Sequence, residues 1–175
     1  MGARWGNNLV KRIACQPLRV KIKIGELIIM LVGTYNHAVD NKNRVFIPVR
    51  FRGDLGLKCV LSRDIMYKCL RLYSVEQWGE YTRKIEELPT IQMSVVRQMV
   101  FPNSDEVDPD SQGRIILNQR LCADVGLAGE KEVIIAGANT HAQIWNVSEW
   151  EKFKDEINAE ANRNAAIEEL IKMRF

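Results

Sequence analysis

The sequence has few of the residues that build metal and catalytic sites. Its 175 residues include two histidines, His37 and His141, and four cysteines, none of them in a Cys-x-x-Cys pair. Zinc sites use closely spaced ligands of these types, so the spacing argues against a metal site. The Gly-x-Ser-x-Gly, P-loop and His-Glu-x-x-His motifs are also missing. We therefore expect no enzyme, no metal and no cofactor.

Long apolar segments and long runs of one charge are missing as well. A transmembrane helix needs about 20 apolar residues, and the stretch Leu27–Val32 is far shorter and precedes no small-x-small cleavage site. With 46% hydrophobic and 27% charged residues, the composition is that of a soluble domain of ordinary size or of two small units. Unpaired cysteines fit a reducing compartment. We expect a cytoplasmic protein without a membrane segment.

The net charge of +3 is unevenly distributed along the chain. Residues 1–29 hold six bases and one acid, which leaves the remainder of the chain at −2. Within that remainder, residues 40–72 hold eight bases and three acids, whereas residues 105–132 hold three bases and seven acids. Nucleic-acid binding needs a basic footprint. Any such footprint should therefore be local, and stronger in the first of these two regions.

Residues 1–29 differ from the rest in their basic composition. We interpret them as an extension outside the fold, either a disordered basic arm or the result of an upstream start. We take Met30 as the functional beginning of the fold, whereas translation starts at either Met1 or Met30. A basic arm would add contacts to phosphates.

An internal repeat organises the rest of the chain. A shift of seventy positions, which becomes seventy-two after a short insertion, superimposes two segments, with matches such as Asp40 with Asp110, Arg44 with Arg114, Gly56 with Gly126 and Trp78 with Trp150. We therefore predict two tandem units, at residues 30–88 and 103–160. A helix or loop at 89–102 joins them, and a helical tail follows at 161–175.

Each unit contains an Asp-x-x-x-Arg turn between two short strands. Asp40 and Asp110 start the turns, where a carboxylate accepts hydrogen bonds from the backbone N–H groups just ahead. Asn43 and Gly113 take the fourth position, and these residue types best tolerate a left-handed backbone. When a hairpin loop ends in such a residue, the arginine that follows is the first residue of the next strand. We assign these four residues to building the turns.

Helices are expected after each turn. A short one lies between Pro48 and Gly56 and between their counterparts Asn118 and Gly126, because proline suits a first helical turn and glycine a helix end. Two short β segments and a longer helix follow in each unit. The apolar spacing of three, three and four in the longer helix defines one face, with Val75, Trp78, Tyr81 and Ile85 repeated as Val147, Trp150, Phe153 and Ile157. Trp78 and Trp150 are therefore predicted to be core anchors, and residues after Ala159 to extend the last helix.

The run MLVGTYNHAVDNKNRVFIP at 30–48, with DSQGRIIL at 110–117, resembles the MraZ family of bacterial transcription regulators. The resemblance covers residues 30 to about 160. It implies a β-rich α+β fold in which two tandem AbrB-like swapped-hairpin units form a small β-barrel with flanking helices. It also implies ring-shaped homo-oligomers at the nucleoid. These bind short direct repeats of double-stranded DNA in the promoter of the division and cell-wall gene cluster, including their own, usually as repressors.

The family's turns carry its DNA contacts, which fall here on Lys42, Arg44 and Arg114. An arginine fork can grip a phosphate or read guanine in the major groove. The chain departs from the family pattern at Asn43, where glycine is usual, and at Asn118, where proline is common. Gln112 replaces the cation that Lys42 gives the first turn. We therefore expect the first unit to attract phosphates more strongly than the second.

Other interpretations remain open. The Asp–Arg pairs of the turns can be purely structural, and Arg50 and Arg120 can pair with Asp54 and Asp124 four residues later. A second hypothesis is a protein-interaction module, because AbrB-like folds also act as antidotes that hold a toxic partner through a tail. An enzyme of an unfamiliar kind is a distant third.

Overall fold

The computed structural model describes residues 30–173, so the predicted extension at 1–29 lies outside it. The first unit comprises β1 (Thr34–Ala38), β2 (Arg44–Phe46), α1 (Val49–Leu55), β3 (Cys59–Arg63), β4 (Cys69–Ser74) and α2 (Val75–Glu86). The second comprises β5 (Ser104–Val107), β6 (Arg114–Ile116), α4 (Gln119–Asp124), β7 (Glu132–Gly137), β8 (Ala142–Asn146) and α5 (Val147–Asn158). Between them lie α3 (Thr90–Val100) and the 3-10 turn η1 (Phe101–Asn103), and α6 (Glu160–Lys172) follows. The predicted β-rich α+β fold of two tandem units is confirmed.

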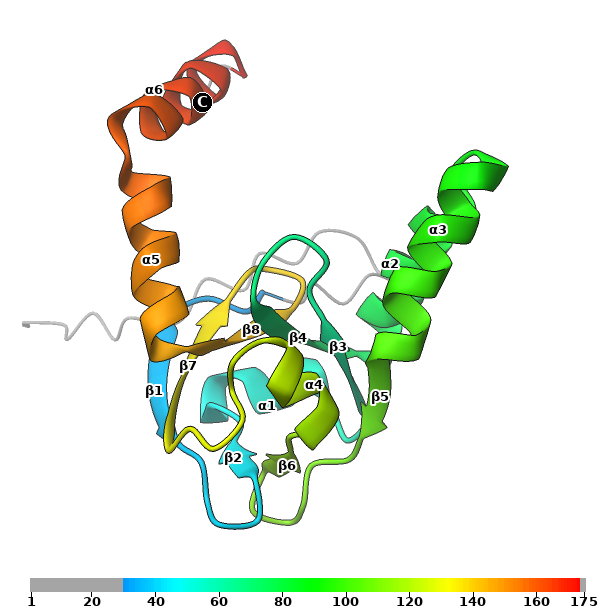
Figure 1. The fold of residues 1–175 in the computed structure, drawn as a ribbon, viewed down its shortest axis with the longest axis vertical. Coiled ribbons are helices and arrows are strands. Elements are labelled where there is room, and N and C mark those ends of the chain that lie inside the picture. The colour runs from blue at the N-terminus through cyan, green and yellow to red at the C-terminus, as the bar shows by residue number, and fades with distance from the viewer. Residues whose placement is uncertain (1–29, 174–175) are drawn as a thin grey trace, which may run out of the picture.

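The two units complete each other's sheet (Figure 1). Six antiparallel strands run in the order β1-β7-β8-β4-β3-β5, so the first strand of each unit pairs inside the other unit. Within the described residues, the hydrogen-bonded strand order runs from β1 at one edge of the sheet to β5 at the other. A separate two-stranded ribbon, β2–β6, is linked to the sheet by a bridge between Val39 and Val45.

An approximate two-fold axis relates the units. In the ribbon Val45 pairs with Ile115, its own counterpart at the shift of seventy. In the sheet Arg71 pairs with Gln143, its counterpart at the shift of seventy-two. The axis therefore passes through both pairs. It places the two turns together at one end of the molecule and α2 and α5 toward the other (Figure 1).

The main core lies between the ribbon, the short helices and the sheet. The inward residues of the ribbon, Val45 and Ile115, are fully buried, as are Phe51 of α1 and Leu121 of α4. Each such side chain stabilises the fold by about 1.5–3 kcal/mol through burial. Because residues alternate along a strand, burial of Val45 and Ile115 turns their neighbours in the ribbon outward.

Side-chain caps fix where the helices begin. The Ser74 hydroxyl accepts from the backbone N–H of Gln77 at 3.2 Å and starts α2. Asn146 caps α5 through the N–H of Ser148 at 2.7 Å, and Asn118 caps α4 through the N–H of Arg120 at 2.8 Å. Such caps contribute about 1 kcal/mol each. Asn118, at the position that matches Pro48, thus provides a different start for the same short helix.

Aromatic clusters attach α2 and α5 to the outer face of the sheet. The structure places Trp78 and Trp150 partly buried, each within one cluster. Trp78 lies 5.6 Å from Tyr73 between ring centroids, and Trp150 lies 5.7 Å from the buried Trp145. Phe153 stacks on Trp145 at 4.8 Å. The helices project from the sheet beyond these contacts (Figure 1).

The prediction that α5 continues into the tail is wrong. Ala159 adopts an extended conformation, with φ −55° and ψ 133°, so that α5 ends at Asn158 and α6 begins at Glu160. The Asn162 side chain crosses the break and donates to the carbonyl of Glu156 at 2.8 Å. No helix within residues 30–173 is both long and apolar enough to cross a membrane.

Candidate nucleic-acid interface

Each turn is built around one aspartate. In the first turn Oδ1 of Asp40 accepts from the backbone N–H groups of Lys42 at 2.8 Å and Arg44 at 3.0 Å. Oδ2 accepts from Nε of Arg44 at 2.8 Å and lies 2.7 Å from its Nη2. Asn43 has φ +54°, in the left-handed region. One carboxylate therefore both closes the turn and holds the arginine.

The second turn repeats this geometry. Asp110 accepts from the N–H groups of Gln112 and Arg114 at 3.0 Å each, and its other oxygen holds Arg114 at 2.8 Å from Nε and 2.7 Å from Nη2. Gly113 has φ +78°. Since both turns have the same hydrogen bonds, the two arginines are presented by the same local structure.

Backbone hydrogen bonds join the two turns into one surface. The N–H of Ile47 donates to the carbonyl of Gly113 at 2.9 Å, and the N–H of Leu117 donates to that of Asn43 at 2.8 Å. Nη1 of Arg44 lies 4.0 Å from Asp110 of the other turn. The structure thus brings together the predicted residues Arg44 and Arg114, each at the start of one of the paired strands β2 and β6. The loops that precede these strands lie side by side (Figure 1).

The aspartates remain ionised over a wide pH range. The hydrogen bond from the Arg44 side chain lowers the pKa of Asp40 to about 2, and Arg114 does the same for Asp110. A guanidinium has five N–H donors, and the aspartate occupies Nε and Nη2. Nη1 of Arg44 lies 4.0 Å from Asp110, which is beyond hydrogen-bond distance. The Nη1 side of each arginine can therefore still donate to a guanine or a phosphate. The structural Asp–Arg pair and an arginine that contacts DNA are compatible.

The outward face of the ribbon combines these arginines with apolar side chains. Phe46 lies two residues after Arg44, and Ile116 two residues after Arg114, so all four share one face. Phe46 is 40% and Ile116 62% exposed. The Arg114 guanidinium lies 5.6 Å from the Phe46 ring centroid. Apolar side chains beside arginines can contact thymine methyl groups. Phe46 and Ile116 are not among the site residues predicted from the sequence, although each follows an apolar residue, Val45 or Ile115, whose burial turns it outward.

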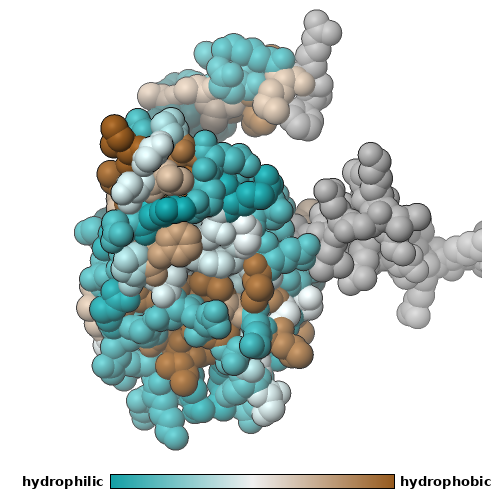
Figure 2. Space-filling model, turned by 90° about the vertical axis from the view of Figure 1, so that its right-hand side faces the viewer, coloured by the Kyte–Doolittle hydropathy of each residue, from teal (hydrophilic) through white to brown (hydrophobic). Residues whose placement is uncertain are grey.

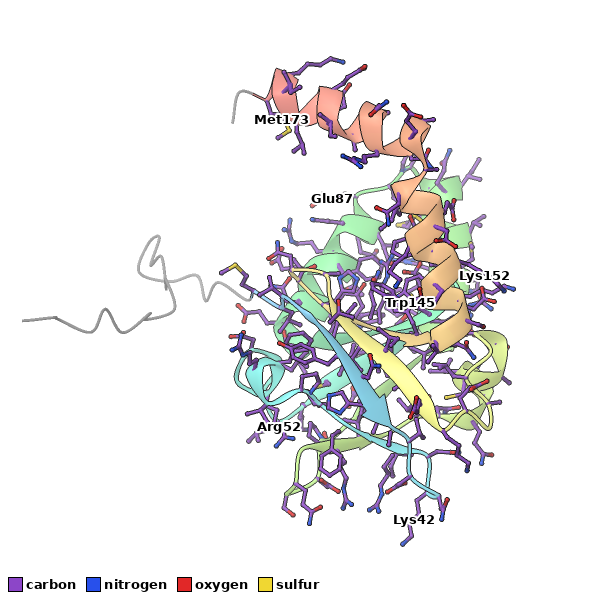
Figure 3. All side chains as sticks on the ribbon, turned by 90° about the vertical axis from the view of Figure 1, so that its left-hand side faces the viewer. Lys42, Arg52, Glu87, Trp145, Lys152 and Met173 are labelled. Carbon is purple, nitrogen blue, oxygen red and sulfur yellow. The ribbon has the colours of Figure 1, made fainter. Side chains whose placement is uncertain are left out.

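Lys42 lies at the tip of the first turn. Its side chain is exposed and projects at the extremity of the molecule (Figure 3). It forms no ion pair with any residue between 30 and 173. The corresponding tip residue of the second turn is Gln112, so the tips themselves differ by one charge.

The alternative in which Arg50 and Arg120 pair with Asp54 and Asp124 is wrong, since neither ion pair forms within residues 30–173. Arg120 instead donates to the Asn103 side chain at 3.1 Å and to the carbonyl of Pro102 at 2.7 Å, because α4 starts beside the 3-10 turn. Asp124 pairs across the fold with Arg63 at 3.7 Å. Arg120 therefore holds the connection between the units.

The part of the chain that the structure describes holds no group of three or more His, Cys, Asp or Glu side chains arranged to bind a metal ion. The cysteines in it, Cys59, Cys69 and Cys122, are buried thiols, and burial raises the pKa of Cys59 and Cys122 to about 11. Thiols with raised pKa values are poor nucleophiles and poor metal ligands.

The sequence is similar to known regulators over the described fold. The family model "MraZ protein, putative antitoxin-like" matches residues 30–95 and 100–174. "Transcriptional regulator MraZ" of Acetivibrio thermocellus is 38% identical over 75% of this chain and 92% of that protein. Its namesake of Alkaliphilus oremlandii is 39% identical over 74% of this chain and 90% of that protein. The protein of the same name from Moorella thermoacetica is 35% identical over 71% of this chain and 86% of that protein.

Proposed function

Because this chain belongs to the MraZ family, we propose that it is a sequence-specific DNA-binding regulator of transcription. The observation that carries the proposal is the pair of adjacent turns, each presenting an arginine held by an aspartate. The relatives are named as regulators of transcription, and their names indicate no enzymatic activity.

The turns and the β2–β6 ribbon would enter the major groove together. That groove is about 12 Å wide and admits a two-stranded ribbon. Arg44 and Arg114 would contact bases or phosphates through their Nη1 sides, and Lys42 would contact a phosphate. Because the aspartates already hold the guanidinium groups, binding restricts little further side-chain entropy. The residues that build the turns, Asp40, Asn43, Asp110 and Gly113, act indirectly by fixing this geometry.

We further propose that the DNA sites are short direct repeats in the promoter of the division and cell-wall gene cluster, including the protein's own promoter. The effect there is repression, and the protein acts at the nucleoid in the cytoplasm. Several linked contacts to repeated sites raise the effective concentration of each contact, so a ring-shaped homo-oligomer suits such a promoter.

Exposed apolar side chains support assembly. Ile91 and Val95 of α3 are 78% and 55% exposed, and Ile171 of α6 is 70% exposed. Apolar side chains reach the surface on the face that carries α3 (Figure 2). Where such side chains gather into a patch, as Ile91 and Val95 do one helical turn apart on α3, the patch often marks a protein–protein interface. Native mass spectrometry should show a closed oligomer, and a monomer at micromolar concentration would contradict the ring.

A DNA titration tests the function itself. With DNA from upstream of the protein's own gene, Arg44→Ala combined with Arg114→Ala should weaken binding, by about 1–3 kcal/mol for each arginine that contacts a base. Arg83→Ala is the control, because Arg83 lies on α2, where it pairs with Glu80 and Glu87. Undiminished binding by the double variant would refute the site assignment.

A protein-binding role is the second candidate. The family description includes the words "antitoxin-like", and every residue of α6 up to Met173 is exposed. This helix could therefore hold a partner protein. A pull-down that yields one stoichiometric protein and retains no DNA would favour this role over the first.

A further inference from the structure

Arg52 belongs to the first unit but lies against the turn of the second. It extends from α1, and its Nε donates to the carbonyl of Ile47 at 2.9 Å. Its guanidinium covers Gly113, where an added Cβ would lie 2.5 Å from Nε and 2.7 Å from Nη1. A side chain at position 113 and the observed position of Arg52 therefore exclude each other.

The first turn lacks this arrangement. The counterpart of Arg52 is Cys122, and the counterpart of Gly113 is Asn43. A hollow of about 240 Å³ lies there, lined by Asn43, Leu117 and Cys122 among others. Those three correspond to Gly113, Ile47 and Arg52 around the second turn. The Arg52 side chain thus occupies a space that the short Cys122 leaves empty in the other half.

The charge of Arg52 is not neutralised within residues 30–173. It forms no ion pair there, and it is only partly buried. At the second turn Asp110 already neutralises Arg114, and Gln112 adds no charge. The pKa of the neighbouring His37 is lowered by burial and secondly by Arg52, so this histidine adds no competing charge at neutral pH.

We propose that Arg52 supplies the cation of the second turn and binds a phosphate of the DNA backbone beside Gly113. The additional cation of the first turn is its own Lys42, whereas that of the second turn is Arg52, which comes from the other unit. Lys42 and Arg52 lie toward the same end of the molecule (Figure 3). The inference rests on the proposed DNA-binding function. The sequence led us to expect that the first turn attracts phosphates more strongly than the second. With Arg52 beside the second turn, each turn instead has one additional cation.

The test is the salt dependence of binding to a promoter fragment. For Arg52→Gln, the slope of log affinity against log salt should fall by about 0.9 for each phosphate that the variant no longer binds. Between 50 and 200 mM salt this makes the variant's affinity deficit shrink by about 3.5-fold. The control Arg83→Gln removes the same charge at an exposed site on α2 and should keep the wild-type slope. A wild-type slope for Arg52→Gln would overturn the inference.

A variant that adds the arginine to the first turn separates a phosphate contact from a structural role. Cys122→Arg combined with Asn43→Gly rebuilds the Arg–Gly arrangement there and should raise the slope by about 0.9. If Arg52→Gln does not fold, this double variant still tests whether the arginine binds a phosphate. An unchanged slope for the double variant would count against the inference. If the wild-type protein binds no DNA at any salt concentration, the proposed function itself fails. If it binds and Arg52→Gln keeps the full slope, only the role of Arg52 fails.

Discussion

Asp40 and Asp110 each use one carboxylate oxygen for the backbone and the other for an arginine. Neither task alone explains the Asp-x-x-x-Arg spacing. An aspartate can close a turn without an arginine, and an arginine can bind DNA without an aspartate. The spacing of four brings the start of the following strand back to the carboxylate, so closure of the turn and orientation of the guanidinium occur together.

The pH dependence of the turns follows from these pairs. Both aspartates have a pKa of about 2, below the ordinary 3.8, chiefly because of the hydrogen bond from the arginine side chain. A lowered pKa means that the pair stabilises the fold fully above pH 4 and that this stabilisation disappears as the pH falls toward 2. Carboxyl-carbon NMR titration should show midpoints near 2. Arg44→Ala should return Asp40 toward 3.8 and leave Asp110 low, and equal midpoints in variant and wild type would contradict this explanation.

A further Asp–Arg pair, Asp64 with Arg71, is buried on the outer face of the sheet and has no counterpart in the other unit. The Asp64 side chain is fully buried, accepts from the N–H of Met66 at 2.7 Å and holds Arg71 by Nε. The matching positions are Ala136 and Gln143. Asp64→Ala would leave the guanidinium unpaired, and we expect the free energy of unfolding to fall by about 3–5 kcal/mol.

Urea unfolding measures this decrease. Glu169→Ala removes the partner of Lys172 in an exposed pair on α6 and serves as the control, with an expected decrease of about 0–1 kcal/mol. Similar decreases for the two variants would mean that the buried pair contributes no more than a surface pair.

Among the helices, strands and turns, the sequence was informative where the signal is local. The left-handed positions at Asn43 and Gly113 and the cap at Ser74 depend on neighbouring residues only, and each could be predicted from a few letters. The break at Ala159 has no proline or glycine to mark it. The contact of Arg52 with Gly113 joins residues of different units, and no periodicity within either unit encodes such a contact.

Glycine substitutions test how tightly the second turn is packed. Gly113 and Gly126 have similar φ angles, +78° and +73°, but an added Cβ meets Arg52 at Gly113 and open space at Gly126. Each change to alanine costs about 1–2 kcal/mol for the left-handed backbone. Gly113→Ala should cost more than Gly126→Ala in urea unfolding, and the excess should disappear in an Arg52→Ala background. Equal costs in the wild-type background would show that Arg52 moves aside freely.

Across the whole molecule, the exchange of strands makes the two units dependent on each other. β1 needs β7, and β3 needs β5. Residues 30–88 alone would therefore expose unpaired strand edges and half of the core. We expect this segment either to remain unfolded or to form a homodimer in which a second copy replaces the second unit. Light scattering with circular dichroism distinguishes these outcomes, and a monomer that unfolds cooperatively would contradict the exchange.

The two turns together are proposed to form one DNA-reading surface about the approximate two-fold axis. A structure of the full chain bound to its promoter DNA is the decisive experiment. We predict that the β2–β6 ribbon faces the major groove, with Arg44 and Arg114 both within hydrogen-bonding distance of bases or phosphates. A complex in which the DNA lies against another face, with these arginines still directed only at Asp40 and Asp110, would refute the proposal.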